Sequence, residues 1–397
     1  MKTYRFRIYP NKQIEQKLQR SLDLCRFTYN NLLSEFNSWD TISKYELQSR
    51  IVDLQICYPE LKEVYSKVLQ YENYRLFSNL KALGETKKKN RKVDKLRFKG
   101  KGWFKTIHYN QSGYKLLMKG KRCQTLKLSK IGEIPIRCHR KINGNIKQVV
   151  VKREASGKWF ASLITNEKKQ VHKKQIKKVV GIDLGLNDSV WDSDNNKTEN
   201  PKFLNKYSLQ LAKRQRQMSK KKLGSKNRNK FRIRLARSYE LLTNTRKDFI
   251  HKLTKYYADN YDCIGMEDMP INNMVKGKKN KFSKSLLDAC FGFIRSEMQR
   301  KAENAGGVFI PVNYRGTTSR CSQCGNNVKK EIWEREHNCI SCGFSASRDY
   351  NSALEIKRLA LIEIGMGRPE STLEEMEALH CKVQLPSMSQ EATSFTA

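Results

Sequence analysis

The chain has 397 residues and carries 79 Lys and Arg against 39 Asp and Glu, a formal net charge of +40. Self-repulsion on this scale requires a polyanionic partner, and nucleic acid fits better than an anionic membrane because no basic amphipathic helix offers a clean apolar face. With 38% hydrophobic and 10% aromatic residues a core can form, which excludes disorder of the whole chain.

Location and redox state follow from two features of the sequence. No run approaches the roughly 18 apolar residues that span a bilayer, and the first residues lack an apolar stretch like that of a signal peptide. We therefore expect an intracellular protein without a membrane partner. In that setting the 11 Cys residues are expected to be free thiols or metal ligands rather than a disulfide framework.

The first part of the chain alternates between strand and helix patterns. Residues 3–9 alternate basic with apolar side chains, which predicts a strand with one buried and one positive face. Helical spacing of apolar residues follows over about 12–36 and 43–85, and short strands separated by Gly-containing turns follow between about 114 and 165. With the first strand these predict a small antiparallel barrel, interrupted by a helical insertion over about 12–110.

Residues 86–105 are dense in Lys and Arg, with Phe98, Trp103 and Phe104 interleaved. A flexible, solvated loop accounts for the charges but not for the rings. A surface that contacts phosphates and offers stacking faces accounts for both. The residues of this region predicted to contact nucleic acid are Lys87, Lys88, Lys89, Arg91, Arg97 and Lys99, with Asn110 beyond it.

Carboxylates end two apolar strands of the second half. Residues 179–182 predict a buried strand that ends at Asp183, and residues 263–266 predict another that ends at Glu267 and Asp268. A third carboxylate, Asp349, opens a predicted helix. Like charges at one sheet edge favour divalent cations, and hard oxygen ligands suit two Mg²⁺ ions able to support phosphodiester displacement. The alternative for each carboxylate alone is a turn or cap residue.

Between these strands, residues 213–237 predict a basic helix pair whose Lys and Arg lie along nucleic-acid phosphates. The alternative is a solvated helix face, which is weaker because the stretch has no acidic residue to balance its charge. The candidate contacts here are Lys220, Lys221, Lys222, Arg232 and Arg234.

Two CxxC pairs, Cys321/Cys324 and Cys339/Cys342, have the ligand count and spacing of a four-cysteine zinc ribbon. Gly325 and Gly343 follow the pairs, as knuckle backbones require. Disulfides are the alternative. Four thiolates leave no open position on zinc, so its role is expected to be structural. After Pro369 the charge becomes acidic, and this tail is expected to be disordered.

Several blocks, taken in order, resemble the TnpB family of RNA-guided transposon-associated endonucleases, ancestors of compact type V CRISPR effectors. The blocks are Tyr4-Arg5-Phe6-Arg7-Ile8-Tyr9-Pro10, Cys25-Arg26-Phe27-Thr28-Tyr29-Asn30, Arg97-Phe98-Lys99, Gly144-Asn145-Ile146-Lys147, Gly181-Ile182-Asp183-Leu184-Gly185-Leu186, Asn200-Pro201-Lys202-Phe203, Ile264-Gly265-Met266-Glu267-Asp268-Met269 and Arg348-Asp349-Tyr350-Asn351-Ser352-Ala353. One departure from the family is the stretch Asp188-Ser189-Val190-Trp191, where a more continuous apolar strand is expected.

The resemblance implies an α+β multidomain protein. Its parts are the first strand of a wedge-type antiparallel β-barrel (1–10), a helical recognition region (11–110), the rest of the barrel (111–172), an RNase H-like RuvC nuclease domain (173–317 and 346–366), an inserted zinc ribbon that binds target nucleic acid (318–345) and the acidic tail (367–397).

The resemblance also implies function. A guide RNA would pair with target double-stranded DNA beside a short adjacent motif, and Asp183, Glu267 and Asp349 would bind Mg²⁺ as the catalytic triad, with Asp268 the less favoured ligand. The protein would be cytoplasmic and associated with the prokaryotic nucleoid when bound to DNA. The alternatives are an RNA-guided DNA-binding repressor that does not cut, or a compact type V CRISPR effector nuclease.

Overall fold

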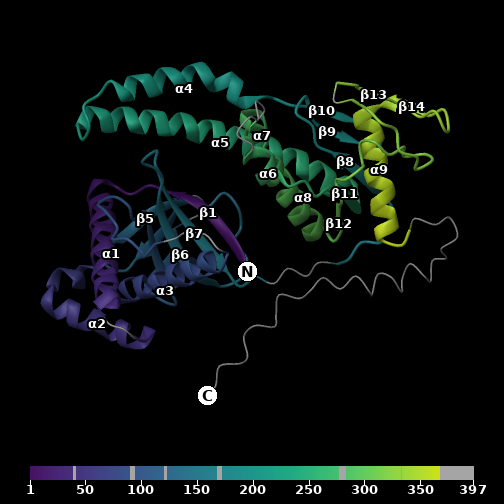
Figure 1. Cartoon of the computed structure of the whole chain (residues 1–397). Coiled ribbons are helices and arrows are strands. Elements are labelled where there is room, and N and C mark those ends of the chain that lie inside the picture. The colour runs from purple at the N-terminus through teal and green to yellow at the C-terminus, as the bar shows by residue number, and fades with distance from the viewer. Residues whose placement is uncertain are drawn as a thin grey trace. The chain divides into compact units, whose positions relative to one another are not determined.

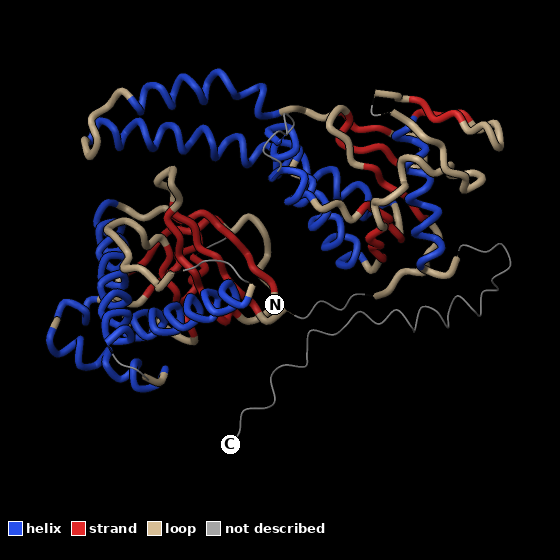
Figure 2. The backbone as a smooth tube through the Cα atoms, in the orientation of Figure 1, coloured by secondary structure: helices blue, strands red, loops and turns tan. Residues whose placement is uncertain are grey.

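The computed structural model describes residues 1–38, 42–89, 94–119, 123–167, 172–276, 283–331 and 333–366. The acidic tail, 367–397, therefore lies outside the described residues. The chain divides into two compact units: residues 1–169 with 229–237, and residues 170–228 with 238–397. Figure 2 shows that each unit combines strands with helices.

The first unit is built on a seven-stranded antiparallel sheet with the order β2-β6-β7-β1-β5-β4-β3. Its strands are β1 (Lys2–Ile8), β2 (Thr106–Asn110), β3 (Tyr114–Lys119), β4 (Cys123–Leu128), β5 (Gly132–Arg137), β6 (Ile146–Arg153) and β7 (Trp159–Thr165). β1 lies at the centre and pairs with β7 from Lys2↔Thr165 to Ile8↔Trp159. Among the described strands no ladder joins β2 to β3, so the predicted barrel is nearly closed rather than closed.

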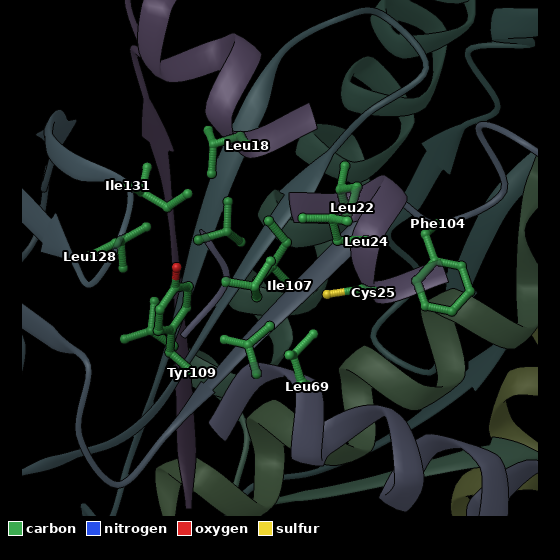
Figure 3. Packing of buried hydrophobic residues seen from close by; sticks show 14 of the residues in the cluster. Leu18, Leu22, Leu24, Cys25, Leu69, Phe104, Ile107, Tyr109, Leu128 and Ile131 are labelled. Carbon is green, nitrogen blue, oxygen red and sulfur yellow. The ribbon is translucent and has the colours of Figure 1, made fainter. Parts of the chain in front are cut away.

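Helices α1 (Lys12–Ser38), α2 (Lys44–Cys57) and α3 (Ser66–Lys88), with the short 3-10 helix η1 (Pro59–Glu63), come between β1 and β2 in the chain. Figure 3 shows the core of this unit, where Leu22 and Cys25 of α1 meet Leu69 of α3 and Ile107 of β2. The apolar faces of the helices and the buried face of the sheet thus form one core.

One predicted boundary is wrong. The expected helical region extends to residue 110, but residues 106–110 form β2 and pair with β6, with Ile107 and Tyr109 buried and their neighbours less so. Alternation over five residues, rather than helical spacing, is the pattern that this short segment follows.

The second unit holds a five-stranded sheet with the order β10-β9-β8-β11-β12. Its strands are β8 (Val179–Asp183), β9 (Asp188–Asp192), β10 (Lys197–Glu199), β11 (Cys263–Glu267) and β12 (Val308–Val312). β8, β11 and β12 are parallel, whereas β9 and β10 are antiparallel additions at one side. The less apolar segment 188–192 does form strand β9, which pairs with β8 and β10. Its buried Asp192 accepts hydrogen bonds from the backbone N–H groups of Asp194 and Asn196 in the turn toward β10.

Helices cover both faces of this sheet. On one face Val180 and Ile264 pack against α5 (Lys226–Asn260) and α8 (Phe291–Ala305), and on the other Val179 and Cys263 pack against α9 (Arg348–Glu363). Figure 1 shows α9 crossing the strands. Strand alternation therefore assigns odd-numbered residues of β8 and β11 to the α9 face.

The remaining elements are α4 (Phe203–Ser219), α6 (Ile271–Lys276), α7 (Ser283–Ala289) and the hairpin β13 (Glu336–Asn338) with β14 (Ser345–Ser347). The predicted basic helix pair corresponds to α4 and the first part of α5, and Arg214 of α4 hydrogen-bonds Ser238 of α5. Cys290 caps the N-terminus of α8 with a positive φ of 56°. No described helix has the length and apolarity to cross a membrane.

Candidate functional site

Strand geometry brings Asp183 and Glu267 to the same edge of the sheet. β8 and β11 are parallel with Ile182 opposite Met266, so the next residues along each strand, Asp183 and Glu267, are neighbours. Both are odd-numbered and point to the face covered by α9. Asp349 is the second residue of α9 and joins them from that side.

Two strand glycines let α9 approach closely. A Cβ atom on Gly181 would lie 2.1 Å from the carbonyl oxygen of Ala353 in α9, and one on Gly265 would lie 2.8 Å from the Cβ of Ala360. Only glycine permits this contact between a strand and a helix backbone. The glycines two residues before Asp183 and Glu267 therefore let α9, which carries Asp349, pack directly against both strands.

Burial and mutual repulsion disfavour the ionised forms of these carboxyl groups. Burial raises the pKa of Asp183 well above its usual range, and the charges of Glu267 and Asp349 raise it further. Burial likewise raises the pKa of Glu267, against a hydrogen bond from Thr317 that lowers it. Three carboxylates that repel one another in a partly dry site form a natural cation site.

The three carboxylates line one open cleft of about 830 Å³, together with the cationic side chains of Lys330, Arg335 and Arg348. In the described chain, only the four ribbon cysteines bring three or more potential ligand atoms within 4.8 Å of one another. The carboxylate oxygens of Asp183, Glu267 and Asp349 thus do not all lie within 4.8 Å of one another in this structure. Carboxylates are hard oxygen donors, the ligand type that Mg²⁺ takes in proteins.

Asp268 occupies a different environment. The backbone turns it away from the cleft, and its carboxylate forms an ion pair with Arg295 of α8. Asp268 does not line the cleft that holds Asp183, Glu267 and Asp349. That Glu267 rather than Asp268 binds a cation stays a prediction.

The four predicted zinc ligands converge. Sγ of Cys321 lies 3.7 Å from Sγ of Cys342, and Sγ of Cys324 lies 3.5 Å from Sγ of Cys339. A disulfide would require about 2.05 Å, whereas Zn–S bonds of about 2.3 Å at a tetrahedral centre place sulfurs about 3.8 Å apart. The thiols thus fit a zinc ion and do not fit the disulfide alternative.

The backbone of the ribbon supports this arrangement in both knuckles. The N–H of Gly325 donates to the carbonyl of Cys321 at 2.9 Å, and the N–H of Gly343 donates to that of Cys339 at 2.8 Å. Both glycines have positive φ, 78° and 73°. Each knuckle therefore has the tight turn that the two glycines in the sequence predicted.

The predicted nucleic-acid contacts of the first unit lie at the end of α3 and in the segment that follows. Lys87 and Lys88 end α3, Lys89 caps it, and Asn110 ends β2, whereas Arg91 lies outside the described residues. Lys88 and Arg97 form exposed ion pairs with Glu85 and Asp94, at 3.1 and 3.8 Å. These placements leave the binding roles as predictions.

The rings of this segment divide into exposed and buried. Phe98 and Trp103 are 59% and 67% exposed, and the Lys99 ammonium lies 5.4 Å from the centre of the Trp103 ring. Phe104 does not fit the predicted stacking surface, because it is buried against Tyr29 and under the Arg75 guanidinium. An apolar ring directly before a strand of the sheet is drawn into the core.

The contacts predicted around the helix pair also lie at the surface. Lys220, Lys221 and Lys222 form the connection from α4 to α5. Arg232 donates to Oδ1 of Asn229 at 2.8 Å, and the guanidinium of Arg234 lies 5.2 Å from the centre of the Phe231 ring. Their roles in binding likewise stay predictions.

Sequence reasoning did not single out Thr317, which contacts Glu267, or Lys330 and Arg335, which line the cleft. Thr317 donates a hydrogen bond to Glu267 across 50 residues of sequence. Lys330 and Arg335 line the cleft from the ribbon, and burial lowers the pKa of Lys330 to about 8. The available signal was their position in the sequence: Thr317 comes shortly before the first cysteine pair, and Lys330 and Arg335 lie between the two pairs. The zinc hypothesis explained that region by its cysteines alone.

Three family descriptions match the chain in succession. Residues 162–278 match the OrfB_IS605 family, described as a probable transposase, and residues 291–356 match the Cas12f1-like TNB domain. Residues 1–39 match the helix-turn-helix domain of OrfB_IS605, although the described residues of this segment form one strand and one helix.

Relatives extend the likeness over most of the chain. The "Putative RNA-guided DNA endonuclease InsQ" of Escherichia coli (strain K12) is 27% identical over 90% of this chain and 91% of its own length. A "Putative RNA-guided DNA endonuclease" from Streptomyces pristinaespiralis is 32% identical over 55% of this chain and 54% of its own.

Solved structures support the same fold. The chain superposes on Cas12f1 from a complex with single guide RNA and target DNA with a TM-score of 0.53, over 87% of this chain and 83% of that one, at 15% identity. This likeness concerns the fold alone. The evidence for the family comes from the ordered motifs, the three family matches and the two sequence relatives. Together they show that the chain belongs to the TnpB family.

Proposed function

We propose that the protein is an RNA-guided DNA endonuclease of TnpB type. A bound guide RNA pairs with matching DNA beside a short adjacent motif, and the cleft at Asp183, Glu267 and Asp349 hydrolyses phosphodiester bonds with Mg²⁺. The observation that carries the proposal is the meeting of three carboxylates from two adjacent parallel strands and one helix in a single cleft.

The sheet order supports a RuvC-like assignment of the second unit. Three parallel strands extended by two antiparallel ones, with a carboxylate at the end of each of two parallel neighbours, suit an RNase H-like nuclease. We assign residues 173–317 and 346–366 to this domain and 318–345 to the zinc ribbon. The ribbon is then an insertion held against the cleft, where it supplies Lys330 and Arg335.

Each part of the cleft has a separate task in hydrolysis. Asp183, Glu267 and Asp349 would hold the cations, which, when bound, supply Lewis-acid stabilisation and lower the pKa of water. Lys330, Arg335 and Arg348 attract and orient the phosphate backbone from the rim. Because the pKa of Asp183 is raised, protons compete with cations for the site, so we expect cleavage to weaken as the pH falls.

Guide RNA accounts for the charge outside the cleft. A net charge of +40 exceeds what a cleft with a few phosphates can neutralise. The lysines and arginines at the end of α3 and around the α4–α5 connection are the proposed phosphate contacts, and Phe98 and Trp103 are proposed to stack on bases. We infer a structural zinc ion in the ribbon, bound by its four cysteines.

A repressor that binds target DNA without cutting is the alternative from another class. It has no use for three mutually repelling carboxylates, which here cost the metal-free protein stability. Within the nuclease class, a transposon-encoded protein and a compact CRISPR effector are distinguished by the RNA that copurifies with the protein. Sequencing that RNA gives either a transposon-end transcript or a CRISPR repeat.

The test is cleavage of a plasmid that carries the guide-matched target, with Mg²⁺ and with EDTA. Asp183→Ala, Glu267→Ala and Asp349→Ala should each reduce cleavage by at least about 10³-fold, since metal assistance is worth several kcal/mol. Asp268→Ala is the matched control, because this neighbouring carboxylate faces away from the cleft, and it should cut. Guide and target binding should persist in all four variants.

Two results would contradict the proposal. If the three triad variants cut at the wild-type rate, this cleft is not the nuclease site. If the guide-loaded wild type binds its target with Mg²⁺ present but never cuts it, the repressor function replaces the nuclease function.

A further inference from the structure

The polar side chain of Thr317 is buried. It is 1% exposed, and its hydroxyl donates a hydrogen bond to Oε1 of Glu267. Within the described chain, no other side chain donates a hydrogen bond to Glu267. The carbonyl oxygen of Tyr314 lies 3.0 Å from the same hydroxyl, but one proton serves one acceptor at a time, and the charged carboxylate is the stronger acceptor.

The backbone around Thr317 is fixed by the ribbon that follows it. The N–H of Arg320 donates to the carbonyl of Gly316 at 2.9 Å, which closes a turn over Thr317. Nζ of Lys330 donates to the carbonyl of Thr318 at 2.9 Å, and the N–H of Val328 donates to the carbonyl of Ser319 at 2.8 Å. Thr317 is therefore the last residue before the ribbon and is held from the ribbon side.

The same ribbon is fastened to the helix that carries Asp349. Asn351, fully buried one turn into α9, donates from Nδ2 to the carbonyl of Arg320 at 2.8 Å and accepts from the N–H of Ser322 at 3.0 Å. One amide side chain thus binds the backbone on both sides of Cys321. The ribbon contacts Glu267 through Thr317 and the helix of Asp349 through Asn351.

We propose that Thr317 is a positioning residue of the cleft: its hydroxyl holds Oε1 of Glu267 and leaves Oε2 free to bind a cation. The inference rests on the proposed function, since it assigns Glu267 to the metal site. A carboxylate held through one oxygen presents the other in a fixed direction, which an unrestrained glutamate side chain with three rotatable bonds does not.

The test compares Thr317→Val, which keeps the branched shape and removes the hydroxyl, with Thr317→Ser, which keeps the hydroxyl. Mn²⁺ binding to the full-length protein is titrated by calorimetry, with Glu267→Gln as the baseline, and cleavage is measured against Mg²⁺ concentration. We expect Thr317→Val to lower Mn²⁺ affinity by about 10- to 100-fold and to shift cleavage to higher Mg²⁺, as loss of a ligand's hydrogen-bond partner does. Thr317→Ser should remain close to wild type.

Two outcomes overturn the inference: Thr317→Val binds Mn²⁺ and cuts like wild type, or Thr317→Ser fails as badly as Thr317→Val. If Thr317→Val also loses zinc or melts early, the double variant with Glu267→Gln decides. A residue that acts through Glu267 adds no further loss of Mn²⁺ affinity, whereas an added loss refutes the role. A wild type that never cuts would instead contradict the proposed function, and the Mn²⁺ titration would still test Thr317.

Discussion

Glu72 offers a test of the first unit's energetics. This residue of α3 is fully buried, and burial raises its pKa from 4.5 to about 8, although the Arg75 guanidinium lies 3.0 Å away and opposes the shift. At neutral pH the folded chain therefore holds a proton that the unfolded chain releases. Glu72→Gln keeps the shape of the protonated side chain and removes the ionisation.

The size of the effect follows from linkage. A raised carboxyl pKa contributes stability that is complete below pH 4.5 and is lost as the pH rises to about 8. At 1.36 kcal/mol per pH unit the whole interval corresponds to about 5 kcal/mol, of which about 3 kcal/mol is lost by pH 7. Glu72→Gln should therefore be more stable than wild type by about 3 kcal/mol at pH 7 and no more stable at pH 4.

The assay is urea unfolding of the full chain between pH 4 and 8, followed by hydrogen exchange of peptides from α1 and α3, which report on the first unit. Glu63→Gln is the matched control, because this glutamate is exposed and forms an ion pair with the exposed Arg20 at 3.5 Å. Its effect should be small at every pH. A Glu72→Gln stability gain that does not grow with pH would refute the reasoning.

Three further predictions concern the second unit and the charge of the chain. Asp183→Asn should raise the melting temperature of the EDTA-treated protein at neutral pH, because the raised pKa of Asp183 marks a cost of ionisation, and the gain should vanish near pH 4; a lower melting temperature at neutral pH would contradict this. Cys321→Ser or Cys339→Ser should release zinc, measured by mass spectrometry of the metal, and destabilise the second unit; wild-type protein without zinc and with paired disulfides would rule out the ribbon. Reversing Lys220, Lys221 and Lys222 to Glu should flatten the dependence of guide RNA affinity on salt, measured by filter binding, and an already flat wild-type titration would mean that the +40 charge has another purpose.

The sequence predicted those parts of the site that depend on local pattern. An apolar run followed by a carboxylate identifies a buried strand and the acidic residue at its end. Because parallel strands end at the same edge of a sheet, the sequence predicted that Asp183 and Glu267 lie close together, and the pairing of β8 with β11 agrees. The four-cysteine cluster was predicted from the spacing of the two CxxC pairs alone. Both patterns are specified by a few consecutive residues.

What the sequence did not show depends on partners far along the chain. β2 is a strand because it pairs with β6, and Phe104 is buried because Tyr29 and Arg75 lie against it. Thr317 gained its partner only when the fold brought Glu267 to it. A short segment is compatible with more than one secondary structure or degree of burial, and contacts with distant residues decide between them. The local sequence alone does not reveal those contacts.

The place of Asp349 on the last described helix also sets an order of events during synthesis. Asp349 follows Asp183 by 166 positions, which a ribosome needs about 10 to 30 s to translate. The strands of the first sheet are made before that interval begins, and the carboxylate cluster is completed only at its end. A nascent chain can therefore begin to fold its basic first unit while it still lacks the third acidic group, and a prematurely terminated chain lacks that group permanently.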